Sequence, residues 1–298
     1  MERDHGRLLR DGLRRLRASK RARREAEEAG EDPGPPGSRI LPFDEGLYGW
    51  PLAVARSLGP DRVRTGTRVV VLRRSPDSGT DWELQVQSAS NGAEASLRAR
   101  SVSLAIPVRP SGRLLAELAP RAAEALARIP YAPVSLIHLI LSREQVGRPL
   151  DGFGILAPSG KAREILGSLW PDSIFPGRNR TDRTVTVNFV GGARTPERAG
   201  ASRETLLAVA TRELKALLGV RGEPIMGRVT RWPQAIPQYT GGHLERIRVV
   251  ARAEEEHPGL RLVGSWRSGV SLGGSWAQGV EAGRSVANRL NGSASAHG

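Results

Sequence analysis

The chain has 298 residues, of which 39% are hydrophobic, so it is long enough to bury one large core or two ordinary ones. Its formal net charge of +14 favours anionic partners: nucleic acid, acidic lipid headgroups or a ligand with several carboxylates. It contains no cysteine, which excludes disulfides, iron–sulfur clusters, thiolate nucleophiles and thiolate zinc sites.

Other patterns narrow the class of protein further. The five histidines lie far apart without a metal-binding spacing, so no metal site is predicted. His138, in the apolar stretch VSLIHLIL, is expected to be a hydrogen-bonded interior residue. The arginines are not interleaved with aromatic residues, which argues against nucleic-acid binding. No apolar run reaches 18 residues and the N-terminus lacks the apolar core of a signal peptide, which predicts a cytoplasmic protein.

Residues 1–38 are predicted to form a basic helix followed by a Pro/Gly linker. Leu9, Leu13 and Leu16 fall on one helical face, and the breaker GEDPGPPGSR ends the helix. The favoured interpretation is a solvated helix with one packing stripe. The alternative is peripheral attachment to a membrane that carries anionic lipid.

Residues 39–110 predict a short helix and a β-meander. The helix covers 47–58, and Gly59 ends it. VRTGTRVVVLRR and WELQVQSA read as strands, and the Asn91-Gly92 turn connects the second of these to EASLRARSVSLAIP.

Residues 111–225 predict a domain in which helices and strands alternate. An alanine-rich helix and two strands are expected at 116–128, 134–142 and 184–192. Ser202 is a predicted N-cap for a helix that runs to about Leu218, and Gly219 is its predicted stop.

Residues 226–298 predict a strand toward Trp232, an irregular segment interrupted by prolines, the short buried strand GLRLVG and a helix from WAQGVEAGRSVANRL. Helices and strands thus mix along the whole chain, and no internal repeat occurs. The fold class is α/β, or mixed α+β.

The stretch GSWRSGVSLGGSWAQGVEAG, residues 264–283, holds six glycines and follows a predicted strand into a predicted helix. Strand, glycine-rich turn and helix together present free backbone N–H groups and the positive end of a helix dipole to a ligand. The stretch has no GxxxxGK[ST] pattern of a nucleoside-triphosphate site. On these residues alone, a ligand site and a plain flexible turn are equally well supported.

Four stretches in order resemble the protoporphyrinogen oxidase branch of the flavin-dependent amine oxidase superfamily. They are ERDHGRLLRDGLRRLR, RPLDGFGILAP with SLWPDSIFPGR, RVTRWPQAIPQYTGGHLERI, and HPGLRLVGSWRSGVSLGGSWAQGVEAGRSVA. The resemblance implies an incomplete Rossmann-like FAD-binding domain, made of 39–110 and 226–298, and a substrate-binding domain with a mixed or antiparallel sheet, 111–225. It also implies oxygen-linked, FAD-dependent oxidation of a porphyrinogen in haem synthesis.

The resemblance implies roles for particular residues. Those that would contact FAD are Val69, Trp232, Ser265, Val270, Ser271 and Leu272, the last three through backbone groups against the flavin ring. Phe153 and Gly154 would lie near the substrate. No catalytic acid or base is expected, because the flavin itself accepts the hydride.

The sequence departs from the family pattern at its start, because no GxGxxG precedes a helix in the first 60 residues. This predicts the C-terminal part of a flavoenzyme, with a separately encoded N-terminal FAD-binding fragment as a partner. The alternatives are a non-catalytic remnant, another member of the superfamily such as an amine oxidase or carotenoid desaturase, and a basic nucleic-acid-binding module.

Overall fold

A computed structural model of the chain describes residues 46–76, 81–158, 163–175, 177 and 182–295. The predicted helix and linker at 1–38 lie outside these residues. The chain divides into two units, 1–54 and 55–298. Helix α2 (Gly49–Leu58) begins in the first unit and ends in the second, and Gly59 follows it with a φ of +88°. The predicted helix at 47–58 and its stop are therefore confirmed.

The β-meander is confirmed as an antiparallel three-stranded sheet in the order β1-β2-β3. Its strands are β1 (Thr67–Arg74), β2 (Trp82–Ser88) and β3 (Glu94–Ala99). The pairing register shifts between Val69 and Val71, which leaves Val70 as a β-bulge. Between β2 and β3, Gly92 has a φ of +70°, as the predicted Asn91-Gly92 turn requires.

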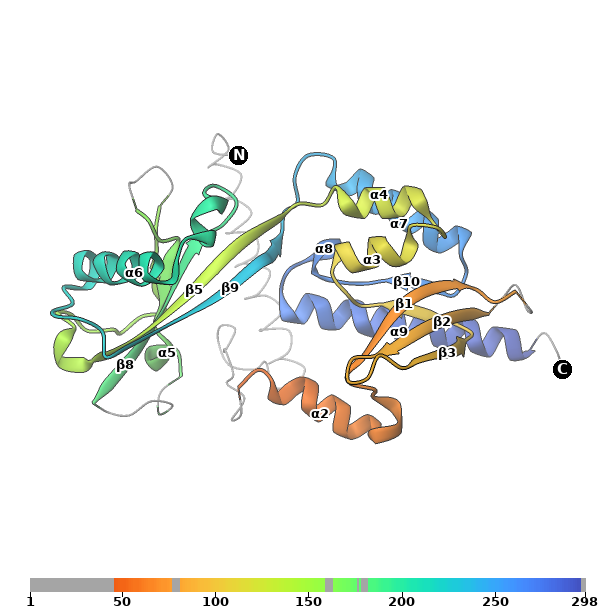
Figure 1. Cartoon of the computed structure of the whole chain (residues 1–298), viewed down its shortest axis with the longest axis horizontal. Helices are drawn as coiled ribbons and strands as arrows, with labels where there is room; N and C mark the ends of the chain where they lie inside the picture. The colour runs from red at the N-terminus through yellow and green to blue at the C-terminus, as the bar shows by residue number, and fades with distance from the viewer. Residues whose placement is uncertain (1–45, 77–80, 159–162, 176, 178–181, 296–298) are drawn as a thin grey trace, which may run out of the picture. The chain divides into compact units, whose positions relative to one another are not determined.

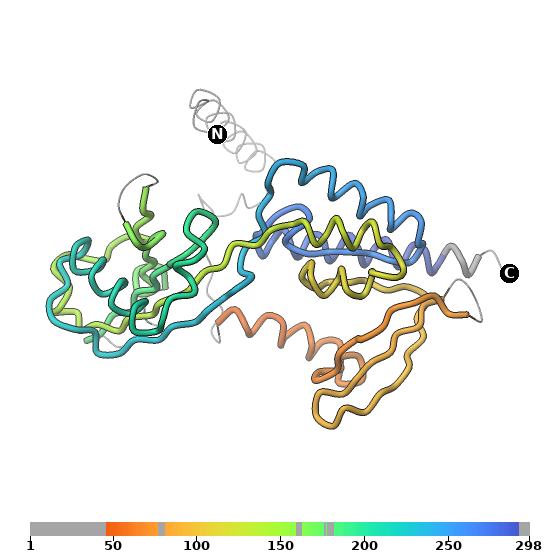
Figure 2. Tube along the Cα trace, turned by 45° about the horizontal axis from the view of Figure 1, so that its top comes forward, coloured from red at the N-terminus to blue at the C-terminus, as the bar shows by residue number. Residues whose placement is uncertain are grey.

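A first hydrophobic core forms around a short parallel sheet of two strands, β4 (Val102–Leu104) and β10 (Leu260–Leu262). Around them lie α3 (Val108–Leu115), α4 (Pro120–Ala127) and α7 (His243–Glu256). Trp82, Leu126 and Trp266 are among the fully buried side chains of this core. The colours of Figure 2 show residues from both ends of the described chain meeting here.

The helix prediction in this region is partly wrong. The helix expected at 116–128 starts later, at Pro120, which takes the first position of α4, and the residues before it, 116–119, are not helical. Sequence reasoning did not predict α3, nor α7, which is the helix between the TGGH segment and β10.

A second core is built on an antiparallel sheet of five strands in the order β6-β7-β8-β5-β9. The strands are β6 (Gly154–Leu156), β7 (Gly167–Leu169), β8 (Arg183–Gly191), β5 (Tyr131–Ser142) and β9 (Met226–Pro237). Helix α6 (Arg203–Leu218) packs on one face, where Leu206 and Leu214 join Ile137, Leu139 and Leu141 in one buried cluster. Short turns of helix occur at α5 (Pro171–Ile174), η1 (Pro60–Arg62), η2 (Arg143–Gln145) and η3 (Pro196–Gly200).

The predicted ends of α6 are confirmed. The Ser202 hydroxyl accepts a hydrogen bond from the Thr205 backbone N–H at 3.1 Å, and Gly219 closes the helix with a φ of +65°.

Strand β9 runs further than the sequence predicts. The segment after Trp232 was expected to be irregular, yet it pairs with β5 as far as Pro237, opposite Tyr131. Because β9 is an edge strand, Pro233 and Pro237 occupy the part of a sheet that tolerates a missing N–H. Figure 1 shows β5 and β9 side by side over this length, connecting the second core with the first. The domain boundaries at 39, 111 and 226 stay predictions.

Candidate functional site

The glycine-rich segment forms a short helix, a three-residue link and a long helix. Helix α8 spans Ser265–Ser268, the link is 269–271, and α9 spans Leu272–Ser295. The expected glycine loop is therefore shorter than the sequence suggested, and Gly273 and Gly274 are helical. The reason is local: the Ser271 hydroxyl accepts from the Gly274 N–H at 3.0 Å, and the Ser271 carbonyl from the Ser275 N–H at 3.0 Å. Such an N-cap starts a helix.

The first turn of α9 offers unused hydrogen-bond donors. Within the part of the chain that the structure describes, the backbone N–H groups of Leu272 and Gly273 have no partner. They lie at the positive end of a 24-residue helix. Val270 and Leu272 are 57% and 51% exposed, so a ligand can reach this turn. The turn suits a group that carries or gains negative charge.

Tyr239 ties this link to the segment between β9 and α7. Its hydroxyl donates to the Ser265 carbonyl and accepts from the Gly269 N–H at 2.8 Å. Its ring stacks on His243 with 4.3 Å between centroids. Burial lowers the pKa of His243, and the nearby Arg246 charge acts in the same direction. One phenol therefore fixes both ends of the 265–269 turn.

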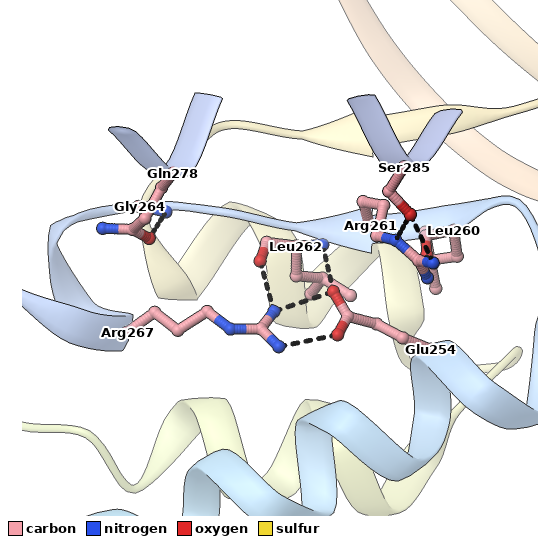
Figure 3. Close-up of polar contacts among 8 residues, drawn as sticks. All are labelled: Glu254, Leu260, Arg261, Leu262, Gly264, Arg267, Gln278 and Ser285. Carbon is pink, nitrogen blue, oxygen red and sulfur yellow. Dashed lines mark hydrogen bonds and ion pairs between the residues drawn. The ribbon is translucent and has the colours of Figure 1, made fainter. Parts of the chain in front are cut away.

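An ion pair between Glu254 of α7 and Arg267 of α8 also holds the 265–269 turn in place (Figure 3). Arg267 donates to both carboxylate oxygens of Glu254 at 2.7 Å, and the Glu254 side chain is only 8% exposed. Glu254 also accepts from the Leu262 N–H at 2.6 Å, and Arg267 donates to the Leu262 carbonyl at 2.5 Å. The pair thereby satisfies the backbone groups of Leu262 that face away from β4.

A cavity of about 710 Å³ adjoins the turn, and residues of β10 and α9 line it. Its charged lining consists of Glu254, Arg261, Arg267 and Glu281. Gln278 also lines it and accepts from the Gly264 N–H at 3.2 Å (Figure 3). The mixture of charges and amides suits a polar ligand better than an apolar one.

The predicted FAD contacts lie on three different elements. Val69 precedes the β1 bulge, Trp232 lies on β9, and Ser265, Val270, Ser271 and Leu272 belong to the α8–α9 region. Trp232 is 53% exposed and lines a cavity of about 230 Å³ with Pro196 and Gly200. Neither Val69 nor 270–272 lines that cavity, so no common cavity joins them there. Their contact with FAD stays a prediction.

The predicted substrate residues lie at the start of β6. Phe153 is 58% exposed, and its carbonyl accepts from the Trp170 N–H at 3.0 Å. At Gly154 an added Cβ would lie 2.0 Å from the Ser168 carbonyl oxygen of β7. Close pairing of β6 and β7 is therefore enough to explain this glycine, and its contact with substrate stays a prediction.

The structure also corrects the expectation for His138. This residue is half-buried, and its Nδ1 is buried without a hydrogen-bond partner among the described residues. The reason lies in its cross-strand neighbours, Val187 and Arg228, neither of which has a side chain that can accept a proton from it.

Sequence reasoning assigned no role to Tyr239, Glu254 or Arg267. Tyr239 lies within RVTRWPQAIPQYTGGHLERI, one of the four stretches that carry the family resemblance. The ion pair had no such signal, because Glu254 is one of three consecutive glutamates at the end of α7. Only the fold distinguishes it from its neighbours.

Over residues 20–291 the chain belongs to the flavin-containing amine oxidoreductase family. It is 30% identical to the chloroplastic protoporphyrinogen oxidase of Nicotiana tabacum over 248 residues, which are 80% of this chain and 44% of that protein. It is 34% identical to the coproporphyrinogen III oxidase of Propionibacterium freudenreichii over 180 residues, 58% of this chain and 33% of the relative.

The fold is similar to the crystal structure of a protein assigned as a protoporphyrinogen oxidase from Exiguobacterium sp. 255-15. The TM-score is 0.69 at 23% identity, over 86% of this chain and 54% of that one. The mixed fold class and the family resemblance are thus confirmed, and the chain spans less than half the length of the tobacco relative. In the described part of the chain no helix has the length and apolarity to cross a bilayer, and no acidic or histidine residues cluster as metal ligands do.

Proposed function

We propose that this chain supplies the flavin-facing and substrate-facing elements of an FAD-dependent oxidoreductase that oxidises a porphyrinogen, with oxygen as the final acceptor. The observation that carries the proposal is the exposed first turn of α9, with free N–H groups on Leu272 and Gly273. FAD supplies the two-electron chemistry when bound. The turn stabilises the negative charge that reduction places on the ring, and it does so without rearranging.

The neighbouring residues hold this turn in place. Tyr239 fixes Ser265 and Gly269, and the Glu254–Arg267 pair fixes β10 below them. In the proposal Val270, Ser271 and Leu272 lie against the ring through their backbone groups. Trp232 borders the ring, and the main chain of Val69 meets the adenine.

The proposal includes a second polypeptide segment, which supplies the part of the FAD site outside the described residues. The two-stranded β4–β10 sheet supports this second segment, because the outward backbone groups are hydrogen-bonded at its β10 edge and lack partners in the described chain at its β4 edge. At the β10 edge, the N–H groups of Leu260 and Leu262 donate to the His257 carbonyl and the Glu254 carboxylate. At the β4 edge, the backbone of Ser103 faces away from β10 and has no partner in the described chain.

An open edge of a parallel sheet is the place where a further strand adds. Helix α9 contacts β10, where Ser285 accepts from Arg261, and it leaves most of its surface open, since Ala282 is the one buried residue between 272 and 291. We propose that the added strand comes from the FAD-binding part of the relatives' length that this chain does not span. The partner is then an N-terminal FAD-binding fragment.

The test is flavin loading of the 298-residue chain, alone and mixed with the N-terminal FAD-binding fragment of a relative. The chain alone should bind FAD weakly, whereas the mixture should become yellow. In the mixture Val270→Asp should abolish loading, because it places a carboxylate against the ring, while the neutral Val270→Asn should load. Flavin absorbance unchanged by Val270→Asp, or stoichiometric loading of the chain alone, would contradict the proposal.

We also propose a cytoplasmic location with peripheral membrane contact through the basic residues of 1–38. The net charge of +14 supports it, because such a surface is attracted to anionic headgroups. Sedimentation with vesicles tests it: the chain should pellet with anionic lipid and stay in solution with neutral lipid. Equal behaviour with both lipids would refute the membrane contact.

A further inference from the structure

The two faces of the five-stranded sheet differ in what covers them. Helix α6 covers the face of Ile137, Leu139 and Leu141. The opposite face carries the alternate residues of the same strands, and a cavity of about 300 Å³ opens on it. The residues that line this cavity are His138, Ile140, Val185, Met226, Arg228 and Thr230.

The pairing register places His138 and Arg228 beside each other. His138 of β5 pairs with Arg228 of β9 on one side and with Val187 of β8 on the other. Directly opposed residues of antiparallel strands lie close, with Cβ atoms roughly 4.5–5.5 Å apart, so both side chains stand over the same part of the sheet.

Both side chains lack an acceptor. His138 Nδ1 is buried without a hydrogen-bond partner, and Arg228 has no carboxylate partner in the described part of the chain. Apart from His138, Arg228 is the one ionisable side chain that lines the cavity, and no acidic residue lines it. Burial lowers the pKa of His138, and the Arg228 charge lowers it further, so His138 is neutral at pH 7 and can donate one hydrogen bond.

We infer that His138 and Arg228 form a subsite for a carboxylate, which in the proposed function is a carboxylate of the porphyrinogen. A carboxylate accepts several hydrogen bonds at once, and its charge is opposite to that of the guanidinium. One carboxylate can therefore accept hydrogen bonds from both His138 and Arg228.

The rest of this face matches the apolar part of such a ligand. In the same cross-strand row as His138 and Arg228 lie Val187 and Leu169, and Gly154 ends the row on β6. Met226, beside the cavity, is 61% exposed. A ligand with an apolar ring system and a carboxylate arm can therefore lie along the row with its arm at β9.

The first test is binding of coproporphyrin III, a stable porphyrin with four carboxylates, to the full chain, followed by its absorbance. Arg228→Gln should weaken binding about tenfold to a hundredfold, which is the range for loss of a hydrogen bond to a charged group. The matched control is Arg231→Gln on the same strand. Arg231 donates to the Ala201 carbonyl and pairs with the buried Ser135, so it belongs to the opposite face.

The second test uses sodium propionate alone and follows the imidazole of His138 by NMR. Bound carboxylate should raise the pKa of His138, because it favours the charged imidazolium, and Arg228→Gln should remove the effect. The Arg228 side chain is exposed, so its removal leaves the fold intact.

The outcomes separate the subsite from the proposed function. If propionate shifts His138 through Arg228 but the flavin-loaded pair oxidises no porphyrinogen, the subsite holds and the proposed function fails. If the loaded pair oxidises a porphyrinogen while Arg228→Gln binds coproporphyrin III like the unmodified chain, the subsite is wrong. Equal losses of affinity for coproporphyrin III in Arg228→Gln and Arg231→Gln would also overturn the subsite, because they would show that the porphyrin carboxylates respond to the overall positive charge and not to Arg228 in particular.

Discussion

At the outer edge of β10, the side chains of Glu254 and Arg267 hydrogen-bond the backbone of Leu262, as a neighbouring strand would do within a sheet. One side chain accepts from the Leu262 N–H and the other donates to the Leu262 carbonyl. The two charges also pair with each other at 2.7 Å in a largely buried place. Removing one partner leaves the other charge buried without compensation, which is a far larger loss than that of an exposed ion pair.

We therefore expect Glu254→Gln to lower the free energy of unfolding by about 3 kcal/mol. Helix α7 provides the matched control: Glu256 pairs with Arg252 at the surface, with side-chain exposures of 58% and 75%. Glu256→Gln should change stability by less than about 0.5 kcal/mol. Urea unfolding of the three proteins measures both effects, and similar losses in the two variants would show that the buried pair has no special role.

His138 makes the stability depend on pH. Its folded-state pKa is lowered by burial and by Arg228, so below the unfolded-state value of about 6.5 the unfolded chain binds more protons. Stability should accordingly be retained above that value and decline as pH falls from about 6.5 through the lower folded-state pKa. His243, whose pKa is also lowered, adds to the decline.

Urea unfolding between pH 8 and pH 5 measures this dependence. His138→Gln should flatten the decline below about pH 6.5 and leave the slope near pH 8 unchanged. An equally steep decline in the variant and the unmodified chain would show that His138 does not contribute.

At the scale of elements, the β6–β7 hairpin depends on a glycine. Gly154 has a φ of +147°, and a Cβ there would meet the Ser168 carbonyl at 2.0 Å. Gly152, two residues earlier, would place its Cβ at an ordinary 3.7 Å from the Trp170 ring. The two positions therefore form a matched pair within one segment.

Gly154→Ala should separate β6 from β7, and Gly152→Ala should not. The Ala157 N–H, which donates to the Leu166 carbonyl at 2.9 Å, reports the separation through faster amide hydrogen exchange. Unchanged exchange at Ala157 in Gly154→Ala would show that the backbone conformation at this position is not needed for the pairing.

At the scale of the whole molecule, the open β4 edge decides how the chain assembles. If a partner strand adds there, Ser103→Pro should abolish association with the N-terminal FAD-binding fragment, because proline removes the outward N–H. Ser103→Thr keeps that N–H and should associate normally. Size-exclusion chromatography of the mixtures distinguishes the two, and association of Ser103→Pro would exclude this edge as the contact.

The sequence by itself determined the features that depend on near neighbours. Local residue patterns predicted β1, β2, β5 and β8, the caps at Ser202 and Gly219 predicted the bounds of α6, and the ordered motifs predicted the family. The predictions were wrong near two prolines, whose effect depends on context. Pro120 begins a helix that was expected to begin at 116, and Pro233 lies within an edge strand that was expected to end.

Only the tertiary structure decided the features that join distant parts of the chain. The pairing of β4 with β10 and the position of Arg228 beside His138 come from strand pairing and register, and the role of Glu254 among three glutamates comes from its contacts with Leu262 and Arg267. Register and long-range pairing depend on how whole surfaces pack, and a shift of one residue would turn each side chain to the other face. Local sequence patterns do not encode that packing, so the sequence indicated the glycine-rich segment as a candidate site but not the residues that hold it in place.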